Sequence, residues 1–288
     1  MTPIAHFAPA KINLSLHVLG KRADGYHALE SLVVFAGVGD RITVQPADAL
    51  CLSVTGPMRA GLAGLPDTDN LVLRAAHLLD GGAARGAHIT LEKHLPVAAG
   101  IGGGSADCAA TLRALTQLWG LGHDLGALAE MGAALGADVP VCLYAPHARV
   151  MSGIGEVIAP APLLPAFWCV LVNPGVPVAT GAVFQALAAG AIAHEGGTFW
   201  PGRFENAHTL ARFLATCRND LEAPARKLVP EVDQVLQAIS TTGGCLLTRM
   251  SGSGATCFGL YASETDAHAA AHALECTDWW VMAAPVCR

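Results

Sequence analysis

A cluster of glycines near the middle of the chain constrains its fold more than any other feature. The segment "LPVAAGIGGGSADCAATLRAL", residues 95–115, holds four glycines in the five positions 100–104 and then continues in helix-forming sequence. Leu112, Leu115, Leu118 and Trp119 mark the apolar face of a helix over about 106–119. Because glycine lacks a Cβ atom, such a cluster lets the backbone approach another group closely. We therefore expect a glycine turn that leads directly into a helix N-terminus.

Neither of two common phosphate-binding patterns fits this turn completely. The Walker A pattern requires a lysine before its hydroxyl residue, and no lysine precedes Ser105. In the pattern G-x-G-x-x-G the last position is Ser105, and the expected strand–helix–strand unit with a later acidic residue is lacking. The physical basis of both patterns remains, because unpaired N–H groups and the positive dipole end of a helix favour an anion. The alternative is a tight turn in which Ser105 caps the helix.

Composition and charge exclude several classes of protein. The 288-residue chain is 52% hydrophobic and 14% charged, which argues against disorder and allows one large domain or two modest ones. Its net charge of −6 argues against a general binder of nucleic acid or of anionic membranes. The nine cysteines form no C-x-x-C pair and no zinc-like cluster, so we expect reduced thiols.

The N-terminal sequence and the length of the apolar runs predict a cytoplasmic location. The N-terminus lacks a basic segment followed by an apolar stretch, so we expect no secretory signal. No uninterrupted apolar run reaches the roughly 18–20 residues that cross a bilayer. We expect neither a membrane nor a nucleic acid as partner, and the sequence indicates no particular oligomeric state.

The order of predicted elements indicates an α+β fold with two lobes. Hydrophobic alternation predicts strands over 11–20, 32–47, 50–56 and 87–96, followed later by 167–175. Helical spacing predicts helices within 70–82, 124–135, 181–190, 229–240 and 264–276. Two strand-like runs flank a glycine turn within 246–263. The proline-rich stretch 160–165 is the expected boundary between domains of residues 1–159 and 160–288.

Three separated stretches together resemble one family, the GHMP small-molecule kinases. They are "APAKINLSLHVLGKRADGYHALES", "LPVAAGIGGGSADCAA" and "MSGSGATCFGLY", in the family's order along the chain. The resemblance implies phosphoryl transfer from ATP, with Mg²⁺ carried in by the nucleotide. It also implies a two-lobed fold, with an N-terminal lobe like the second domain of ribosomal protein S5 and a ferredoxin-like C-terminal lobe.

The first stretch, together with "LGADVPVCL" and "SGIGE", is similar to the family members that act on a cytidine-diphosphate-linked methylerythritol. The resemblance implies phosphorylation of one hydroxyl of this polyol in the non-mevalonate route to isoprenoid precursors. Another kinase of the family acting on a different small alcohol is an alternative. A catalytically silent nucleotide-binding protein is a second alternative, which the intact Lys11 and Asp138 oppose.

Two charged residues are the expected catalytic pair. Asp138 lies in the otherwise apolar segment "GADVP", where a carboxylate needs a purpose or a partner, and we interpret it as the base for the attacking hydroxyl. The resemblance places Lys11 beside it, where an ammonium group favours the ionised carboxylate. Asn13 follows two residues later and so shares a strand face with Lys11. The alternatives are a helix-terminus aspartate, a surface lysine and a solvated asparagine.

Substrate and ATP contacts follow from the same resemblance. Tyr26 and His27 are expected to bind the cytidine end by stacking and hydrogen bonding, although a turn after Gly25 with aromatics packed at its edge is the alternative. Thr180 and Phe184 are expected to complete that pocket, and a core phenylalanine is as plausible for Phe184. The phosphate loop, residues 96–106, comprises Pro96, Val97, Ala98, Ala99, Gly100, Ile101, Gly102, Gly103, Gly104, Ser105 and Ala106.

Four further features complete the expectations. Gly252, Ser253 and Gly254 form a second glycine turn that is expected to close the site, with a plain β-turn as the alternative. Asn70 is expected to cap its helix near the adenine, and Asp107 to support the cap of its helix while pointing away from phosphate. The loop 194–208 matches nothing nameable, and the spacing of its histidines and Glu195 does not make a convincing metal site.

Overall fold

The computed structural model describes residues 2–22, 25–188, 197–275 and 278–287, which form two compact units. The first unit comprises Met1–Ala10, Val38–Val97 and Gly102–Ala145, and the second comprises Lys11–Gly37, Ala98–Ile101 and Pro146–Arg288. Strands β1 (Ile4–Asn13) and β3 (His27–Gln45) contribute residues to both units. The predicted domain boundary at residue 160 divides the chain into two continuous pieces, whereas each compact unit is made of three separate segments. The boundary stays a prediction.

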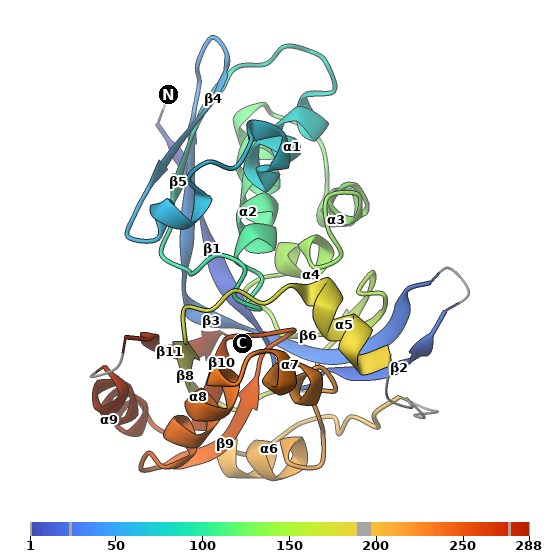
Figure 1. Ribbon diagram of the computed structural model, residues 1–288. Coiled ribbons are helices and arrows are strands. Elements are labelled where there is room, and N and C mark those ends of the chain that lie inside the picture. The colour runs from blue at the N-terminus through green and yellow to red at the C-terminus, as the bar shows by residue number, and fades with distance from the viewer. Residues whose placement is uncertain (1, 23–24, 189–196, 276–277, 288) are drawn as a thin grey trace. The chain divides into compact units, whose positions relative to one another are not determined.

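The first unit combines a small mixed sheet with four α-helices. Strands β4 (Leu50–Thr55) and β5 (Ala87–Glu92) are parallel, and β5 pairs antiparallel with the second half of β3. The short 3₁₀ helices Arg59–Leu62 and Asp67–Asp69 precede α1 (Leu71–Asp80). Helices α1 and α2 (Gly103–Leu118) pack side by side, and α3 (Leu125–Ala133) and α4 (Val139–Leu143) pack against α2 (Figure 1).

Local sequence explains where these helices begin and end. Asn70 caps α1 by accepting the N–H of Val72 at 2.9 Å, and Gly81 ends the helix in the left-handed conformation, as predicted. Helix α2 begins three residues earlier than expected, because its N-cap is Gly102, a glycine with φ of 63°. Ser105 therefore lies inside the first turn of the helix, and the interpretation of Ser105 as the N-cap is wrong.

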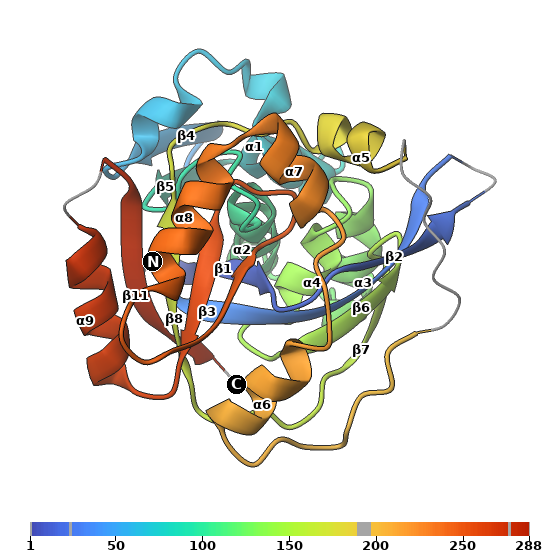
Figure 2. The same cartoon turned by 60° about the horizontal axis from the view of Figure 1, so that its bottom comes forward.

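The second unit contains a four-stranded antiparallel sheet in the order β11-β8-β10-β9. Its strands are β8 (Trp168–Asn173), β9 (Cys245–Met250), β10 (Cys257–Tyr261) and β11 (Trp280–Cys287). Helices α8 (Glu231–Ser240) and α9 (Glu264–Leu274) pack against this sheet (Figure 2). The succession strand, helix, two strands, helix, strand with this order is ferredoxin-like, as predicted.

Strand β3 continues this sheet, because Phe35 and Ala36 pair antiparallel with the end of β11. The first half of β3 pairs with β2 (His17–Lys21) and with β6 (Arg149–Gly153), and β6 pairs with β7 (Val157–Pro160). Helices α5 (Thr180–Ala188), α6 (Ala207–Leu214) and α7 (Glu222–Leu228) lie between β8 and α8 in the chain. The sequence did not predict β6, β7, β11, α6 or α7, which are short or lack clear periodicity.

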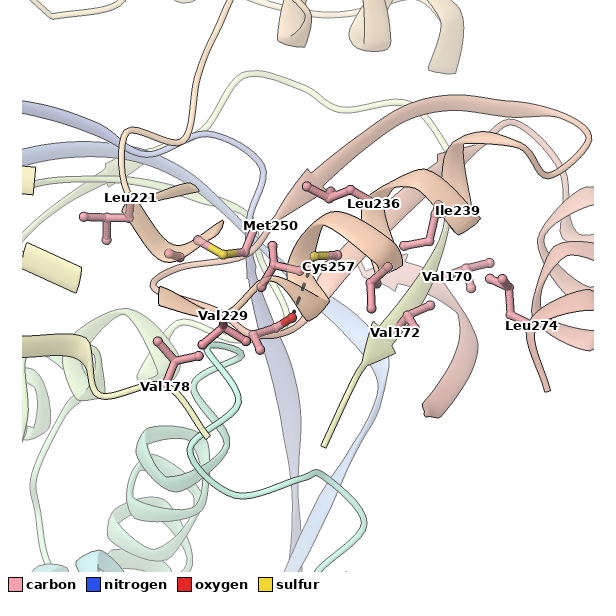
Figure 3. Close-up of a cluster of buried hydrophobic side chains, with 14 of the residues drawn as sticks. Val170, Val172, Val178, Leu221, Val229, Leu236, Ile239, Met250, Cys257 and Leu274 are labelled. Atoms are coloured by element: carbon pink, nitrogen blue, oxygen red, sulfur yellow. Dashed lines mark hydrogen bonds between the residues drawn. The ribbon is translucent and has the colours of Figure 1, made fainter. Parts of the chain in front are cut away.

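Buried aliphatic side chains from the sheet and its helices form the core of the second unit. Figure 3 shows Val170 and Val172 of β8 with Leu236 and Ile239 of α8, all members of one buried cluster. Cys257 belongs to the same cluster, and its Sγ donates to the carbonyl oxygen of Ala255 at 3.7 Å (Figure 3). All cysteines in the described part of the chain are free thiols, as expected for a protein that uses cysteine as a small apolar residue.

Candidate active site

Lys11 and Asn13 lie at the end of β1 and are almost fully buried, with exposures of 3% and 1%. The Lys11 backbone N–H donates to the carbonyl oxygen of Ile101 at 2.9 Å. The Asn13 N–H donates to Ser251 Oγ at 3.1 Å, and its Nδ2 donates to Ser31 Oγ at 2.7 Å. The alternatives of a surface lysine and a solvated asparagine are therefore wrong.

The central part of the phosphate loop, residues 98–101, lies directly against the second glycine turn. A Cβ atom on Gly100 would lie 2.6 Å from the carbonyl oxygen of Gly254, and one on Gly252 would lie 2.8 Å from the carbonyl oxygen of Gly100. Gly100 also has a φ of +75°, which glycine adopts without strain. These two glycines are therefore required by the contact between the two backbones, independently of any ligand.

Polar side chains hold this contact together. Ser251 Oγ donates to the carbonyl oxygen of Gly100 at 3.2 Å. The backbone N–H of Thr256 donates to the carbonyl oxygen of Ala99 at 3.1 Å. Buried Asn219 donates through Nδ2 to the carbonyl oxygens of Met250 and Gly252, both at 2.8 Å. The sequence analysis missed Ser251 and Asn219. Nothing local marks them, because these partners lie 31 to 238 residues away along the chain.

The later part of the phosphate loop forms the N-terminus of α2. The N-cap Gly102 provides no side-chain cap, and the helix begins at Gly103. The first N–H groups of an α-helix have no partner within the helix. Gly104 is exposed and Ser105 is half-buried, so the first turn of α2 is in part accessible from solvent. This arrangement suits an anion such as a phosphate group.

A buried ion network lies beneath this helix end. Lys93, which follows β5, donates through Nζ to Oδ2 of Asp40 and, at 2.8 Å, to Oδ2 of Asp107. Burial raises the pKa of the Asp107 carboxyl to about 7; the charge of Lys93 opposes this shift and that of Asp40 reinforces it. The expectation that Asp107 supports the helix cap is wrong, because its side chain is buried and paired with Lys93.

Asp138 occupies the N-cap position of α4 and is half-buried. Its carboxylate accepts no capping hydrogen bond, and Pro140 lies in the first turn of the helix, where proline is tolerated. Asp138 therefore lies at a helix terminus, as the alternative interpretation expected, but its side chain does not cap the helix. Asp138 belongs to the first unit and Lys11 to the second, and their pairing stays a prediction.

The structure brings two of the predicted cytidine-binding residues together. The rings of His27, at the start of β3, and Phe184, on α5, are stacked with centroids 5.2 Å apart and planes inclined by 24°. Tyr26 precedes His27 and is 61% exposed, after a glycine in a left-handed conformation. Thr180 Oγ1 lies 2.9 Å from Ser253 Oγ, which joins the start of α5 to the second glycine turn. Phe184 also packs partly against the core, and its role in binding cytidine stays a prediction.

No preformed metal cluster is found among the described residues. No group of three or more histidine, cysteine, aspartate or glutamate side chains there is arranged to hold an ion. Of the weak metal candidates in the loop 194–208, His194 and Glu195 lie outside the described residues, and His208 is exposed. No helix in the described part is long and apolar enough to cross a membrane.

Comparisons with known proteins identify the family. Residues 70–146 match the model of the GHMP kinases N-terminal domain, and residues 202–279 match that of the GHMP kinases C-terminal domain. The chain belongs to the GHMP kinase family. This GHMP kinase shares 54% identity over 286 residues with the 4-diphosphocytidyl-2-C-methyl-D-erythritol kinase of Parvibaculum lavamentivorans, covering 97% of each chain.

Two further comparisons agree. The enzyme of the same name from Paramagnetospirillum magneticum is 52% identical, over 98% of each chain. A crystal structure of 4-(cytidine 5'-diphospho)-2C-methyl-D-erythritol kinase matches with a TM-score of 0.77 and 34% identity, covering 99% of this GHMP kinase and 100% of that chain. The predicted two-lobed GHMP kinase fold is thereby confirmed.

Proposed function

We propose that this GHMP kinase transfers the γ-phosphoryl group of ATP to the 2-hydroxyl of 4-diphosphocytidyl-2-C-methyl-D-erythritol, a step of the non-mevalonate pathway to isoprenoid precursors. The observation that carries this proposal is the full-length identity above 50% to kinases of that name. The stacked pair of His27 and Phe184 supports a substrate with an aromatic base.

The phosphate loop is the proposed ATP site. The first turn of α2 offers N–H groups and the positive end of the helix dipole to the phosphates, so that no Walker lysine is needed. Residues 98–101, braced by the second glycine turn, form the other half of this loop. We propose that Gly252, Ser253 and Gly254 act mainly through this bracing, and that Asn70 lies near the adenine.

Magnesium is proposed to enter with the nucleotide. Mg²⁺ keeps several waters and usually binds through phosphate oxygens with few protein ligands, which fits a site built from backbone N–H groups. When bound it would neutralise charge on the β- and γ-phosphates.

Asp138 and Lys11 are the proposed catalytic residues. The substrate hydroxyl oxygen attacks the γ-phosphorus, the bond from that phosphorus to the oxygen of the departing ADP breaks, and Asp138 accepts the hydroxyl proton. A lysine ammonium near the carboxylate favours its ionised form and stabilises charge around the reacting hydroxyl. A buried Lys11 beside Asn13 is compatible with this role.

The nucleoside end of the substrate is assigned to the second unit. His27 and Phe184 present stacked rings, Tyr26 presents an exposed aromatic face, and Thr180 offers a hydroxyl near Ser253. We propose that these four residues, with Asn13, bind the cytidine-linked polyol. The domain boundary at residue 160 and a cytoplasmic location remain predictions.

The test measures ADP production by the purified protein with ATP and Mg²⁺. The cytidine-linked methylerythritol is compared with free methylerythritol, mevalonate, homoserine and galactose. We expect turnover only with the cytidine-linked polyol. Turnover confined to another alcohol would overturn the substrate assignment, and nucleotide binding without any turnover would favour a silent nucleotide-binding protein.

A further inference from the structure

The buried ion network beneath α2 has no part in the chemistry described above. Lys93, Asp40 and Asp107, here called the charged triad, are 2%, 0% and 2% exposed. Charged side chains are almost never buried to this degree unless they are paired, and removing one partner of such a group is strongly destabilising. One ammonium and two carboxylates also leave the triad with a charge of −1 when all three are ionised.

The charged triad ties three chain segments to one point. Asp40 lies on β3, Lys93 follows β5, and Asp107 lies on α2. Asp40 uses its second oxygen, Oδ1, to accept the backbone N–H groups of His94 at 2.6 Å and Leu95 at 2.9 Å. The triad therefore contacts both the residues that precede the phosphate loop, His94 and Leu95, and the helix that follows it, α2.

The first turn of α2 rests on the lysine itself. A Cβ atom on Gly103 would lie 3.2 Å from Lys93 Nζ and 3.6 Å from the Leu95 side chain, so it would point into the protein and not toward a ligand. A side chain at position 103 would therefore crowd the paired ammonium group. The backbone of the first turn of α2 thus lies close to Lys93.

We propose that Lys93, held between Asp40 and Asp107, is a positioning residue for the triphosphate, and that the net charge of this triad sets the affinity for ATP. The proposal rests on the assignment of ATP to the phosphate loop. A triad with a charge of −1 lies beneath the helix end that must accept a polyanion, and one added proton removes that charge.

The added proton belongs on Asp107. Its Oδ1 has no hydrogen-bond partner among the described residues, and burial raises its pKa. Lys93 and Asp40 are the charged groups that act on it. Of the neighbouring helices, α1 carries Arg74, which acts on the adjacent Cys108, together with His77 and Asp80. Helix α3 carries the exposed Glu130 and has Asp124 as its N-cap, and α4 has Asp138 as its N-cap.

The first test is the substitution Asp107→Asn, which keeps the shape and removes the charge. The dissociation constant of MgATP is measured between pH 6 and pH 8 without an acceptor alcohol. We expect wild-type affinity to weaken with rising pH, to about 3- to 10-fold below that of the variant at pH 8, with the two proteins nearly equal at pH 6. A ratio that is the same at both pH values would overturn the proposal.

Asp80→Asn is the matched control. Asp80 is a carboxylate of the same unit, 8% exposed, that accepts the N–H groups of Ala84 at 3.1 Å and Arg85 at 2.7 Å at the end of α1. Its substitution also removes a buried charge and should leave the pH profile of MgATP binding as in the wild type. If Asp80→Asn shifts the profile as Asp107→Asn does, the charge of the triad has no special role.

A second test addresses positioning. Lys93→Met removes the ammonium group and should raise KM for ATP at least tenfold while changing KM for the cytidine-linked polyol little. An equal rise in both KM values would show a merely structural role. If this variant does not fold, the pH profile of Asp107→Asn decides alone. A wild-type chain that binds MgATP but phosphorylates no polyol would overturn the proposed function and leave the MgATP-binding test of Asp107→Asn intact.

Discussion

The carbonyl oxygen of Gly254 lies so close to Gly100 that a Cβ atom at position 100 would approach it to 2.6 Å. The phosphate loop and the second glycine turn, more than 150 residues apart in the chain, are thus in backbone contact. Their two glycine motifs depend on each other, because a side chain at Gly100 or at Gly252 would meet the backbone of the other segment.

Gly100→Ala tests this contact. The added methyl group meets two carbonyl oxygens at 2.6 and 2.7 Å and sits on a residue with φ of +75°, so both sterics and strain oppose it. We expect a loss of about 2–4 kcal/mol in the free energy of unfolding, measured by urea denaturation. Gly122→Ala is the control, because nothing lies within 4 Å of its Cβ position. Equal stabilities of the two variants would contradict the contact.

Asp138→Asn tests the proposed base. The amide keeps the shape but accepts no proton, so turnover should fall on the order of 10²–10⁴-fold while ATP affinity stays nearly unchanged. Steady-state kinetics and nucleotide binding measure the two quantities. Asp124→Asn is a suitable control, because Asp124 caps α3 through the N–H of Ala127 and asparagine caps equally well. A loss below tenfold for Asp138→Asn would exclude the residue as the base.

Phe184→Ala tests the nucleoside pocket. Removing the ring that stacks on His27 should raise KM for the cytidine-linked polyol about 3- to 30-fold, because an aromatic contact contributes on the order of 0.5–2 kcal/mol. KM for ATP should stay the same. Phe199→Ala removes a phenylalanine that is 90% exposed and should change neither value. A rise in KM for ATP alone would show that Phe184 contributes to binding ATP and not to binding the polyol.

His17 should make stability depend on pH. Its Nε2 accepts the N–H of Arg218 at 3.0 Å, so the neutral ring carries its proton on Nδ1, next to Thr198 Oγ1 at 3.0 Å. Burial lowers the pKa of His17 below 6.5, Arg218 lowers it further, and Asp220 and Glu30 oppose the shift. The unfolded chain therefore binds more protons than the folded chain just below pH 6.5, and stability falls there as the pH falls.

His17→Gln measures this contribution. Glutamine keeps an acceptor for Arg218 but does not titrate, so the variant should lose less stability than the wild type between pH 7.5 and pH 5. Urea denaturation at several pH values measures the difference. His208→Gln, at an exposed position, should behave as the wild type does. Identical curves for wild type and His17→Gln would show that protonation of His17 is not linked to unfolding.

Local sequence was sufficient wherever neighbouring residues decide the backbone. Asn70 caps the start of α1 as predicted, Gly81 ends the helix within the predicted range 70–82, and the runs around the second glycine turn form β9 and β10. The start of α2 was misplaced by three residues, because the helix begins within the glycine run, with Gly102 as its N-cap, where the sequence shows no helical periodicity. The ferredoxin-like order of strands followed from the family resemblance and not from periodicity, since β11 was not predicted at all.

The sequence by itself determined the glycine turns, the cap of α1, the family and the residue types available for phosphoryl transfer, because these are local signals or ordered motifs. Only the tertiary structure decided what the glycines face. Gly100 lies against Gly254, Gly103 lies over Lys93, and buried Asn219 holds the second glycine turn. The physical reason is that close approach, burial and charge pairing arise between residues far apart in the chain. The hydrophobic periodicity of a segment does not indicate which distant residues it will contact.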